Sequence, residues 1–400
     1  MRLLIANELY ECGGAENVFR DEVQLCLNAG FDVRTITFDP NFIKSEFPDH
    51  HNYPIDGGSA WKLRIRLFGD SALRSDLLQL IEDFQPEVIH VHNAVNSMLS
   101  ICSAISAYRA RHPSVTSLQT LHDYGVVCPR SWCIHDDGSV CSGYCAENCF
   151  GDKCCLNFQD KLKRLLMNRI NSARRHAFDR LVSPSEFLVT TCAANNIAAD
   201  CVRNPFKAPQ VSCLSFSERD DVIVYVGAVA ERKGCTNLIK AWKSSDLARA
   251  GWRLRIIGSV ERDYEETFTS LLEDANGINV LGKLSREETL EEIVKAKYLI
   301  APSLWIENYP TTVLEALACG TVCLGSNRGG IPELIGKDGI LFNPLSVPAI
   351  TKVLNECLII NRVIWESWSK SGVKRVRREN DPQVYLGSLF GLNSKMENNG

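Results

Sequence analysis

Apolar and polar positions along the first half of the chain alternate with the periods of strands and helices. Short apolar runs predict strands, and apolar residues spaced three or four apart predict amphipathic helices. The predicted strands are residues 2–6, 32–38, 87–93 and 115–121, and the predicted helices are residues 15–29, 73–84 and 97–110. Pro, Asn, Asp, His and Gly accumulate over residues 40–60, which predicts a loop. The alternation indicates a parallel sheet covered on both faces.

The second half of the chain repeats this pattern. Its predicted strands are residues 221–227, 253–258, 278–281 and 297–302, and its predicted helices are residues 236–245, 263–274 and 286–296. The first two strands end at Gly227 and Gly258. Strands that end at glycine leave open loops at the carboxyl edge of a sheet, where such folds bind ligands.

The predicted fold class is therefore α/β, with two Rossmann-like domains. A chain of 400 residues is too long for one ordinary core. Residues 204–220 are rich in Pro, Ser and charge, which marks a boundary. We expect domains at 1–207 and 208–372 and a last helix at 373–393 that returns to the first domain. The tail after Asn393 is expected to be disordered.

Charge and composition exclude several classes of protein. The 44 basic and 48 acidic residues give a net charge of −4, which lacks the excess of basic residues expected of a nucleic-acid-binding protein. No apolar run approaches the length of a membrane span, and no cleavage site follows the apolar opening residues. We expect a cytoplasmic protein whose 17 cysteines stay reduced.

Two glutamates in the stretch 299–335 form the most informative pattern. Glu307 and Glu315 have seven residues between them, and Pro310 suits the first turn of a helix that contains Glu315. Free amides and the positive dipole at such a helix start favour bound phosphate, and two carboxylates can accept hydrogen bonds from separate sugar hydroxyls. The alternative is a pair of solvated surface charges, which the apolar, glycine-punctuated surroundings disfavour. A second loop offers backbone for close approach to a ligand, at Asn327, Gly329 and Gly330.

This stretch and several weaker motifs resemble the retaining glycosyltransferases of family 4, which have the two-domain GT-B fold. The similarity runs across nearly the whole chain. The motifs are GGAE at 13–16, PEVIHVHN at 86–93, His122-Asp123, SPS at 183–185, NP at 204–205, VGAVAERKG at 226–234 and the two glutamates. The resemblance implies two facing Rossmann-like domains with a cleft between them, the first on the acceptor side and the second binding a nucleotide-sugar.

The resemblance also implies roles for single residues. Glu315 would hold the nucleotide ribose, and Glu307 would contact the transferred sugar. Lys233 would bind the diphosphate, which suits a flexible cation beside a strand that ends in glycine. His122 would lie over the donor sugar from the opposite domain. A core or surface role is the ordinary alternative for such a histidine or lysine.

Other candidates surround these residues. The loop at Gly13 and Gly14 would lie close to the diphosphate or the acceptor, although it is also compatible with a simple turn. Thr311 and Thr312, at the start of the predicted helix, complete the predicted donor-binding set. One departure matters: the family usually has an arginine where this chain has Ala228. The neighbouring cation that would replace it is Arg232.

The function implied is transfer of a hexose from a nucleoside-diphosphate sugar to a glycan or lipid-linked glycan, with retention of configuration. Such a reaction belongs to cell-surface polysaccharide biosynthesis. It requires no cofactor, and no residue has the signature of a covalent nucleophile, which suits a transition state stabilised by charge. Two alternatives remain: a nucleotide-sugar epimerase of the same fold, and a non-catalytic nucleotide-sugar-binding protein, which the loss of arginine at Ala228 favours.

A cysteine-rich insertion occupies residues 128–155. Its seven cysteines are accompanied by His135 and by few aliphatic residues. A structural zinc ion would order such a segment, since thiolates select zinc in a reducing cell. The spacing lacks CxxC pairs, so packed thiols are an equal alternative. The candidate ligands are Cys128, Cys133, Cys141, Cys145, Cys149 and Cys154.

Residues 160–180 predict a basic amphipathic helix with seven Lys and Arg against two Asp. Its apolar positions recur at helical spacing, which favours packing on the domain. The alternative is an interfacial helix that contacts an anionic membrane, on the inner face of which a lipid-linked acceptor would be available.

Overall fold

The computed structural model describes residues 1–10, 13–136, 138–141, 149, 154, 157–206 and 213–391. The chain forms two compact units. Unit 1 is Met1–Pro205 together with the chain from Pro382, and unit 2 is Phe206–Asp381. The sequence pattern predicts domain ends at residues 207 and 372. The structure agrees closely with the first, but unit 2 extends to Asp381.

Within the described residues, unit 1 contains a seven-stranded sheet with the order β3-β2-β1-β4-β5-β6-β7. All neighbouring strands are parallel. The strands are β1 (Arg2–Ala6), β2 (Asp32–Thr37), β3 (His50–Asn52), β4 (Val88–Val91), β5 (Thr116–Thr120), β6 (Arg180–Ser183) and β7 (Asp200–Cys201). The central strand β4 is buried along its whole length, because helices cover both faces of the sheet.

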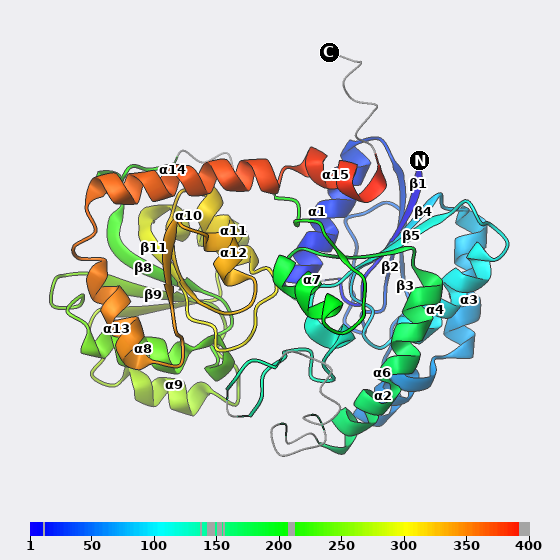
Figure 1. The fold of residues 1–400 in the computed structure, drawn as a ribbon, viewed down its shortest axis with the longest axis horizontal. Helices are drawn as coiled ribbons and strands as arrows, with labels where there is room; N and C mark the ends of the chain where they lie inside the picture. The colour runs from blue at the N-terminus through cyan, green and yellow to red at the C-terminus, as the bar shows by residue number, and fades with distance from the viewer. Residues whose placement is uncertain are drawn as a thin grey trace, which may run out of the picture. The chain divides into compact units, whose positions relative to one another are not determined.

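The helices of unit 1 are α1 (Gly14–Asn28), α2 (Ser59–Phe68), α3 (Ser71–Phe84), α4 (Met98–Arg109), α6 (Phe158–Ala177), α7 (Glu186–Ala193) and α15 (Pro382–Phe390). Apolar side chains of α2, α3, α4 and α6 pack on one face of the sheet. Those of α1 and α15 pack on the other face, on the opposite side of the ribbon in Figure 1. The last helix of the chain is therefore part of the core of unit 1.

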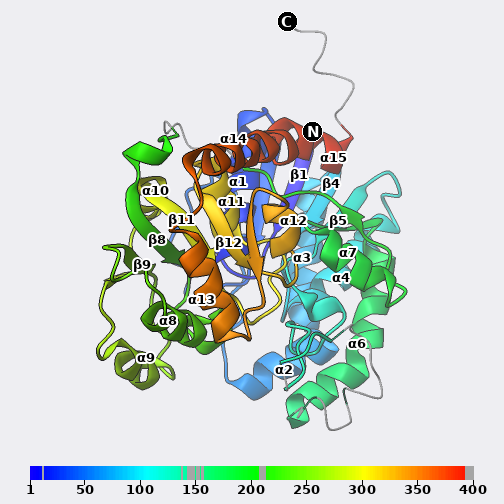
Figure 2. The same cartoon turned by 60° about the vertical axis from the view of Figure 1, so that its left-hand side comes forward.

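Unit 2 contains, in its described part, a six-stranded parallel sheet with the order β10-β9-β8-β11-β12-β13. The strands are β8 (Asp220–Val226), β9 (Arg253–Ile257), β10 (Ile278–Gly282), β11 (Ala296–Ala301), β12 (Val322–Ser326) and β13 (Gly339–Phe342). The helices are α8 (Cys235–Ser244), α9 (Glu265–Leu272), α10 (Arg286–Lys295), α11 (Thr311–Ala318), α12 (Ile331–Ile335), α13 (Val347–Glu356) and α14 (Arg362–Glu379). One apolar core joins α8, α9 and α13 to the sheet, and a second joins α10, α11 and α12. Helices α8 and α13 lie side by side in Figures 1 and 2.

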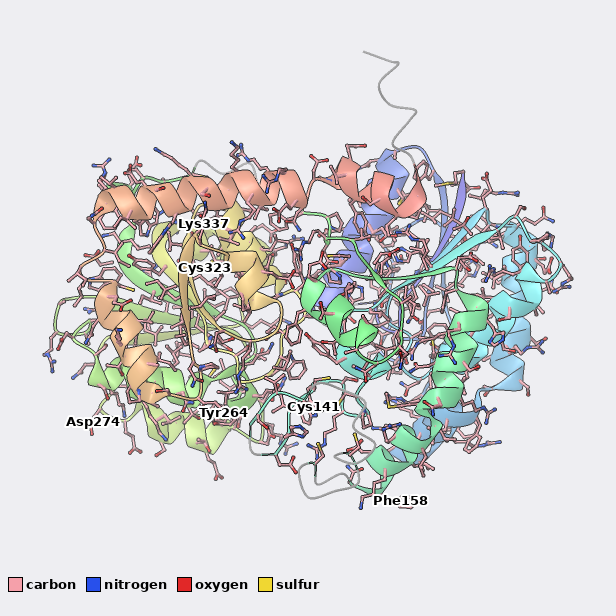
Figure 3. The ribbon with its side chains drawn as sticks, in the orientation of Figure 1. Cys141, Phe158, Tyr264, Asp274, Cys323 and Lys337 are labelled. Carbon is pink, nitrogen blue, oxygen red and sulfur yellow. The ribbon has the colours of Figure 1, made fainter. Side chains whose placement is uncertain are left out.

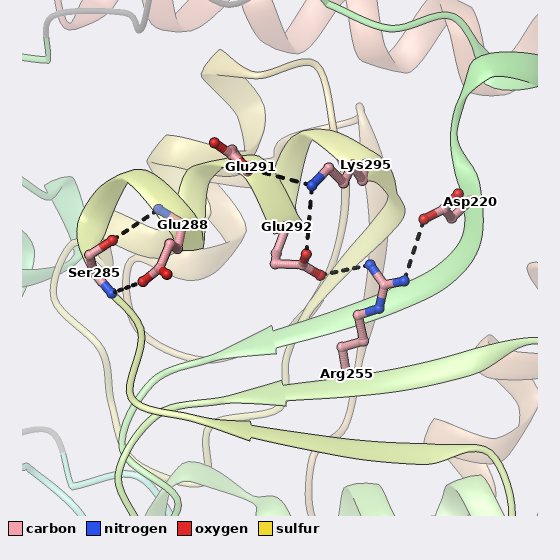
Figure 4. Close-up of polar contacts among 7 residues, drawn as sticks. All are labelled: Asp220, Arg255, Ser285, Glu288, Glu291, Glu292 and Lys295. Atoms are coloured by element: carbon pink, nitrogen blue, oxygen red, sulfur yellow. Dashed lines mark hydrogen bonds and ion pairs between the residues drawn. The ribbon is translucent and has the colours of Figure 1, made fainter.

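Helix α10 is held at both ends by polar contacts (Figure 4). Ser285 and Glu288 form a capping box: Glu288 N donates to Ser285 Oγ at 3.2 Å, and Ser285 N donates to Glu288 Oε2 at 2.9 Å. Near the other end, Arg255 of β9 donates to Glu292 Oε2 at 2.6 Å. These contacts fix the helix on the sheet and with it the position of Arg286, its first residue.

The alternating strands and helices predicted for the two halves are present, with ends within two residues of the prediction, and the predicted basic helix at 160–180 is Phe158–Ala177 in the structure. The loop predicted at 40–60 is wrong in part, because it contains β3 and the start of α2. Side-chain hydrogen bonds hold β3 at the sheet edge: His50 Nδ1 lies 2.8 Å from Thr35 Oγ1, and Thr37 Oγ1 donates to Asn52 Oδ1 at 2.9 Å. Because all three residues of β3 are polar, the strand has no alternation of apolar and polar residues from which it could be predicted.

The predicted helix at 373–393 is two helices in the structure. Helix α14 ends at Glu379 in unit 2, and α15 begins at Pro382 in unit 1. Proline lacks the amide hydrogen that would continue the helix, and it suits a first helical turn. The predicted disordered tail after Asn393 lies outside the described residues.

Candidate functional site

A backbone clamp at the carboxyl edge of unit 2 joins the loop before α8 to the loop after β11. Leu304 N and Trp305 N both donate to Arg232 O at 3.1 Å. Gly234 has φ +80°, and a Cβ there would lie 2.0 Å from Pro302 O, so this approach requires glycine. The clamp places Arg232 and the adjacent Lys233 beside the loop that carries Glu307.

Lys233 and Glu307 form an ion pair. Lys233 Nζ lies 2.6 Å from Glu307 Oε1, and Ser303 Oγ donates to the same oxygen at 2.7 Å. The lysine and glutamate side chains are only 24% and 14% exposed. Lys233 Nζ also lies 5.3 Å from the ring centroid of Trp305, which adds a cation–π contact. A cation and a carboxylate are thus held together on a rigid edge.

Arg232, the cation predicted to replace the missing arginine, has another partner. It forms an ion pair with Glu261 in the loop after β9. This hydrogen bond is the main cause that raises the pKa of Arg232 above its usual value. Ala228 offers only backbone: its carbonyl accepts a hydrogen bond from Tyr225 Oη at 2.6 Å. The site therefore combines Lys233 with an Arg232–Glu261 pair.

Helix α11 carries the second glutamate. Pro310 caps its start, and Thr311 and Thr312 form a half-buried first turn. Glu315 is 8% exposed, and Arg286 Nε of α10 lies 3.7 Å from its Oε1. The helix thus combines free amide donors at its start with a buried carboxylate one turn later.

The predicted second loop packs against the loop of Glu307. Gly330 N donates to Glu307 O at 2.8 Å. Gly329 has φ +60°, and a Cβ there would lie 2.2 Å from the same carbonyl oxygen. Asn327 N donates to Phe342 O of β13 at 2.8 Å. Glycine is required for this contact, and the contact holds Glu307 from a second side.

In unit 1, the carboxylate of Glu22 is a buried hydrogen-bonding centre. His90 Nδ1 lies 2.6 Å from Glu22 Oε1, and Tyr385 of α15 donates to Oε2. His90 Nε2 lies 2.7 Å from Thr120 Oγ1. Burial opposes the charge, but the neighbouring histidines hold the pKa of Glu22 below its usual value. The group is therefore an anion that only accepts hydrogen bonds.

This centre extends to His122, the predicted catalytic histidine at the end of β5. His92 Nε2 lies 3.1 Å from Glu22 Oε2 in a poorly aligned contact, and His92 Nδ1 lies 2.8 Å from His122 Nε2. The two rings stack with centroids 5.1 Å apart. Burial is the main cause that lowers the pKa of both histidines, so both are neutral.

These contacts determine where the protons lie. A lone pair on His92 Nε2 would repel the carboxylate of Glu22, so that nitrogen carries the proton. Neutral His92 then has its lone pair on Nδ1, which accepts a hydrogen bond from His122 Nε2. His122 is left with the lone pair on Nδ1, as a hydrogen-bond acceptor. Sequence reasoning missed Glu22 and His92, although both lie in motifs it noted or next to them.

Gly13 and Gly14 are exposed at the start of α1. A Cβ on Gly13 would lie 3.2 Å from Glu16 Oε2. Burial is the main cause that raises the pKa of Glu16. The structure therefore places Gly13 beside a buried carboxyl group in the first turn of α1.

Part of the cysteine-rich insertion is described. Cys128, Cys141, Cys149 and Cys154 line one small cavity, and His135 Nδ1 lies 3.2 Å from Cys154 Sγ. A hydrogen bond with Cys133 is the main cause that lowers the pKa of Cys128 to about 6. Cys145, the sixth predicted ligand, lies outside the described residues. Four of the predicted thiols therefore face one cavity, and a structural zinc ion on them stays a prediction.

Among the residues that the structure describes, one group of three has ligand atoms close enough to hold a metal ion: Glu22, His90 and His92. Its 2.6 Å contact between His90 and Glu22 is a direct hydrogen bond, and Tyr385 donates to the other carboxylate oxygen. Both carboxylate oxygens of Glu22 therefore already accept hydrogen bonds from neighbouring side chains.

The predicted basic helix is α6, and it packs on unit 1 through Met167, Ile170 and Ala177. Leu165, one of the apolar positions that recur at helical spacing in this segment, is 65% exposed. Phe158 is 79% exposed at the first residue of the helix, where Figure 3 labels it. No helix in the described ranges is long and apolar enough to cross a membrane.

Comparison with known proteins identifies the domain in unit 2. Residues 212–366 match the family Glycosyl transferases group 1. The lipopolysaccharide 1,2-N-acetylglucosaminetransferase of Salmonella typhimurium is 27% identical over 202 residues, which are 45% of this chain and 53% of that protein. The MMP alpha-(1->4)-mannosyltransferase of Mycolicibacterium hassiacum is 30% identical over 157 residues, 35% of this chain and 34% of that protein. The chain spans about half or less of these relatives.

Solved structures match over nearly the whole chain. Sucrose-phosphate synthase from Thermosynechococcus elongatus has a TM-score of 0.67 at 16% identity and covers 97% of both chains. Anabaena Alr3699/HepE in complex with UDP has a TM-score of 0.70 at 14% identity, covering 98% of this chain and 100% of that one. These matches confirm the predicted fold class of two parallel-sheet α/β domains, as in GT-B glycosyltransferases.

Glu22→Gln is expected to allow His122 to adopt both neutral tautomers. An amide donates as well as accepts, so it no longer fixes the proton on His92. Nitrogen-15 NMR of the histidine side chains should show His122 protonated at Nε2 in the parent protein and in both tautomers in the variant. The free energy of unfolding should fall by about 1.5–3 kcal/mol, the value of a hydrogen bond to a charged group.

Glu82→Gln is the matched control, because Glu82 is a partly exposed carboxylate that pairs with His112 at 3.2 Å and with Arg111 at 2.7 Å. It should cost at most about 1 kcal/mol and leave the His122 signals unchanged. A His122 spectrum that stays the same in Glu22→Gln would contradict the proton assignment.

Proposed function

We propose that this protein is a glycosyltransferase that moves a hexose from a nucleoside-diphosphate sugar to an acceptor glycan. The observation that carries the proposal is the half-buried Lys233–Glu307 pair, within the domain that matches group 1 glycosyltransferases. A cation for diphosphate, carboxylates for hydroxyls and free helix amides are the groups that such a donor requires.

Each donor group has a partner in this proposal. Glu315 accepts hydrogen bonds from the ribose hydroxyls, and the amides at Thr311 and Thr312 bind phosphate oxygens. Glu307 accepts from hydroxyls of the transferred sugar. Lys233 exchanges its contact with Glu307 for the diphosphate, whose two charges attract the ammonium more strongly than one carboxylate does. His122 accepts a hydrogen bond from the sugar at Nδ1.

The reaction proposed retains the anomeric configuration. The leaving diphosphate gains charge in the transition state, and Lys233 with the α11 amides stabilises it. No divalent ion is assigned to this step, because these groups already supply the positive charge. A zinc ion on the cysteines of the insertion would be structural, since thiolate sites with all positions filled by protein serve folding.

The acceptor proposed is a glycan or lipid-linked glycan of a cell-surface polysaccharide. The names of the relatives support this class, among them an O-antigen chain mannosyltransferase B of Escherichia coli, 27% identical over 132 residues, which are 32% of this chain and 34% of that protein. The structure of HepE in complex with UDP and glucose supports a nucleoside-diphosphate hexose as donor.

A lipid-linked acceptor would bring the protein to the inner face of a membrane, and the surface of α2 and α6 suits that contact. Phe158 and Leu165 of α6 are exposed, as are Trp61 and Phe68 of α2. Arg169 of α6 lies over the Phe68 ring, 5.8 Å from its centroid, so basic and apolar groups are interleaved. This combination binds anionic lipid by burial and charge together.

Glu315→Gln should weaken binding of the bare nucleoside diphosphate and of the donor alike, because the ribose is common to both. Glu307→Gln should spare the bare nucleotide and lower turnover, since it loses only the sugar contact and frees Lys233 for phosphate. A lost charge-assisted hydrogen bond corresponds to roughly 10- to 150-fold in the affected step. Calorimetry with the nucleotide and steady-state transfer rates measure the two effects separately.

The matched control is Glu291→Gln, which removes an exposed carboxylate of α10 whose ion pair in the described structure is with Lys295. It should leave binding and transfer within about twofold. If both site variants behave like this control, the glutamates do not bind a donor and the proposed function is wrong.

Transfer should persist in excess chelator, because Lys233 and helix amides take the place of a divalent ion on the diphosphate. Initial rates with and without chelator, and after addition of magnesium or manganese, measure this. Elemental analysis of protein purified without added metal should find about one equivalent of zinc for a four-ligand thiolate site. Loss of transfer on chelation with recovery on magnesium would rule out the metal-free step.

The double variant Phe158→Ser, Leu165→Ser should bind anionic vesicles about tenfold more weakly than the parent, because each side chain loses apolar burial. Co-sedimentation with phosphatidylglycerol vesicles at low salt measures the affinity, which should also fall as salt rises. Ile43→Ser is the control, since Ile43 is 96% exposed elsewhere on unit 1. Equal loss in both proteins would show that α6 has no special contact with lipid.

A further inference from the structure

A pocket in unit 1 lies at the carboxyl ends of β4 and β5. It holds about 650 Å³ of space, its open mouth included. His122 and Asp123, which follow β5, line one part of it, and three cations line the rest: Arg66 of α2 and Lys163 and Arg174 of α6. The pocket therefore includes His122, and its three cations come from helices of unit 1 to which no donor group is assigned.

Arg66 is the cation in this pocket that lacks a partner. Its half-buried guanidinium makes no hydrogen bond or ion pair with any residue in the described ranges. Burial is the main cause that lowers its pKa below the usual arginine value, against the attraction of Asp123, Glu8 and Asp160. A guanidinium has five donors, so leaving all of them without a protein partner in a concave site is costly.

Arg174 is only partly satisfied. Its Nη1 donates to Asn171 Oδ1 at 2.7 Å, and its buried Nε has no hydrogen-bond partner. Burial lowers its pKa as well, and the positive charge of Arg66 lowers it further. Lys163, by contrast, is paired with Asp160 at 2.9 Å. Two arginines thus repel each other across the pocket while the lysine is neutralised.

Asp123 is the nearby carboxylate, and it is held away from both arginines. Its Oδ1 accepts a hydrogen bond from Gly125 N at 2.6 Å and caps a short 3-10 turn at Tyr124–Val126. It contributes attraction to Arg66 and Arg174 but forms no ion pair with either in the described structure. Neither arginine therefore has its charge neutralised by a direct ion pair within the described residues.

We propose that this pocket binds a phosphate group carried by the acceptor. Phosphate oxygens match the fork of a guanidinium and have enough lone pairs for donors that come from two helices at once. The donor diphosphate is assigned to Lys233 in unit 2, so we assign a phosphate held by α2 and α6 of unit 1 to the other substrate. The assignment to the acceptor rests on the proposed function, whereas the binding of phosphate does not.

The test is a titration of the full chain, labelled at arginine Nε with nitrogen-15, with inorganic phosphate. The Nε–H signals of Arg66 and Arg174 should shift together and saturate with one dissociation constant. Arg66→Gln should raise that constant about tenfold or more at the Arg174 signal, as expected for loss of a guanidinium–phosphate contact. An Arg174 signal that does not respond, or the same constant in the variant, would overturn the proposal.

Arg64→Gln is the matched control, because it removes an equal charge from an exposed position of the same helix. It should leave the phosphate constant within about twofold, since exposed charges are screened. In phosphate-free buffer, Arg66→Gln should melt at or above the temperature of the parent, because it removes an unpaired cation. Phosphate should stabilise the parent and the Arg64 variant but not the Arg66 variant.

Two further arms identify the source of the phosphate. If a lipid headgroup supplies it, Arg66→Gln should bind phosphatidylglycerol vesicles about tenfold more weakly than Arg64→Gln. If a water-soluble acceptor supplies it, the two variants should bind vesicles equally and glycerol phosphate should shift the Arg174 signal. None of these measurements requires sugar transfer. If the protein binds nucleotide but the Arg174 signal does not respond to phosphate, the proposed phosphate pocket is wrong. If the Arg174 signal responds but the protein does not bind nucleotide, the proposed function is wrong.

Discussion

The geometry of unit 1 depends on the buried carboxylate of Glu22. An ion without water must be fully paired, so the elements that supply its partners are held in one arrangement. Those partners come from β4, through His90, and from α15, through Tyr385. His92 passes the same constraint to His122 at the end of β5. The last helix of the chain therefore helps to determine the proton position on a site histidine far away in sequence.

In unit 2, backbone hydrogen bonds position the site residues. Its site charges lie in loops, which a sheet alone does not hold in place. The carbonyl of Arg232 accepts two amide hydrogen bonds from the loop after β11, and the carbonyl of Glu307 accepts one from Gly330. These bonds hold the two loops together, and the side chains reach across so that Lys233 Nζ lies 2.6 Å from Glu307 Oε1. A rigid backbone with a replaceable side-chain contact is suited to binding a charged ligand.

The two charged regions differ in how they are compensated. Lys233 and Glu307 neutralise each other, so an anion that binds Lys233 would compete with an existing contact. Arg66 and Arg174 have no such internal partner, and burial lowers the pKa of both. A positive surplus of this kind weakens the fold slightly and favours an anion from outside.

The sequence by itself determined the alternation of strands and helices, the start of α11 at Pro310 and the stretch that holds both glutamates. These depend on period and on local backbone preference, which neighbouring residues settle among themselves. Only the tertiary structure decided that Arg232 pairs with Glu261, that β3 completes the sheet edge and that Arg66 and Arg174 share a pocket. Those pairings join residues far apart in the chain, and a side chain's partner there is chosen by the packing of whole elements, which no local pattern records.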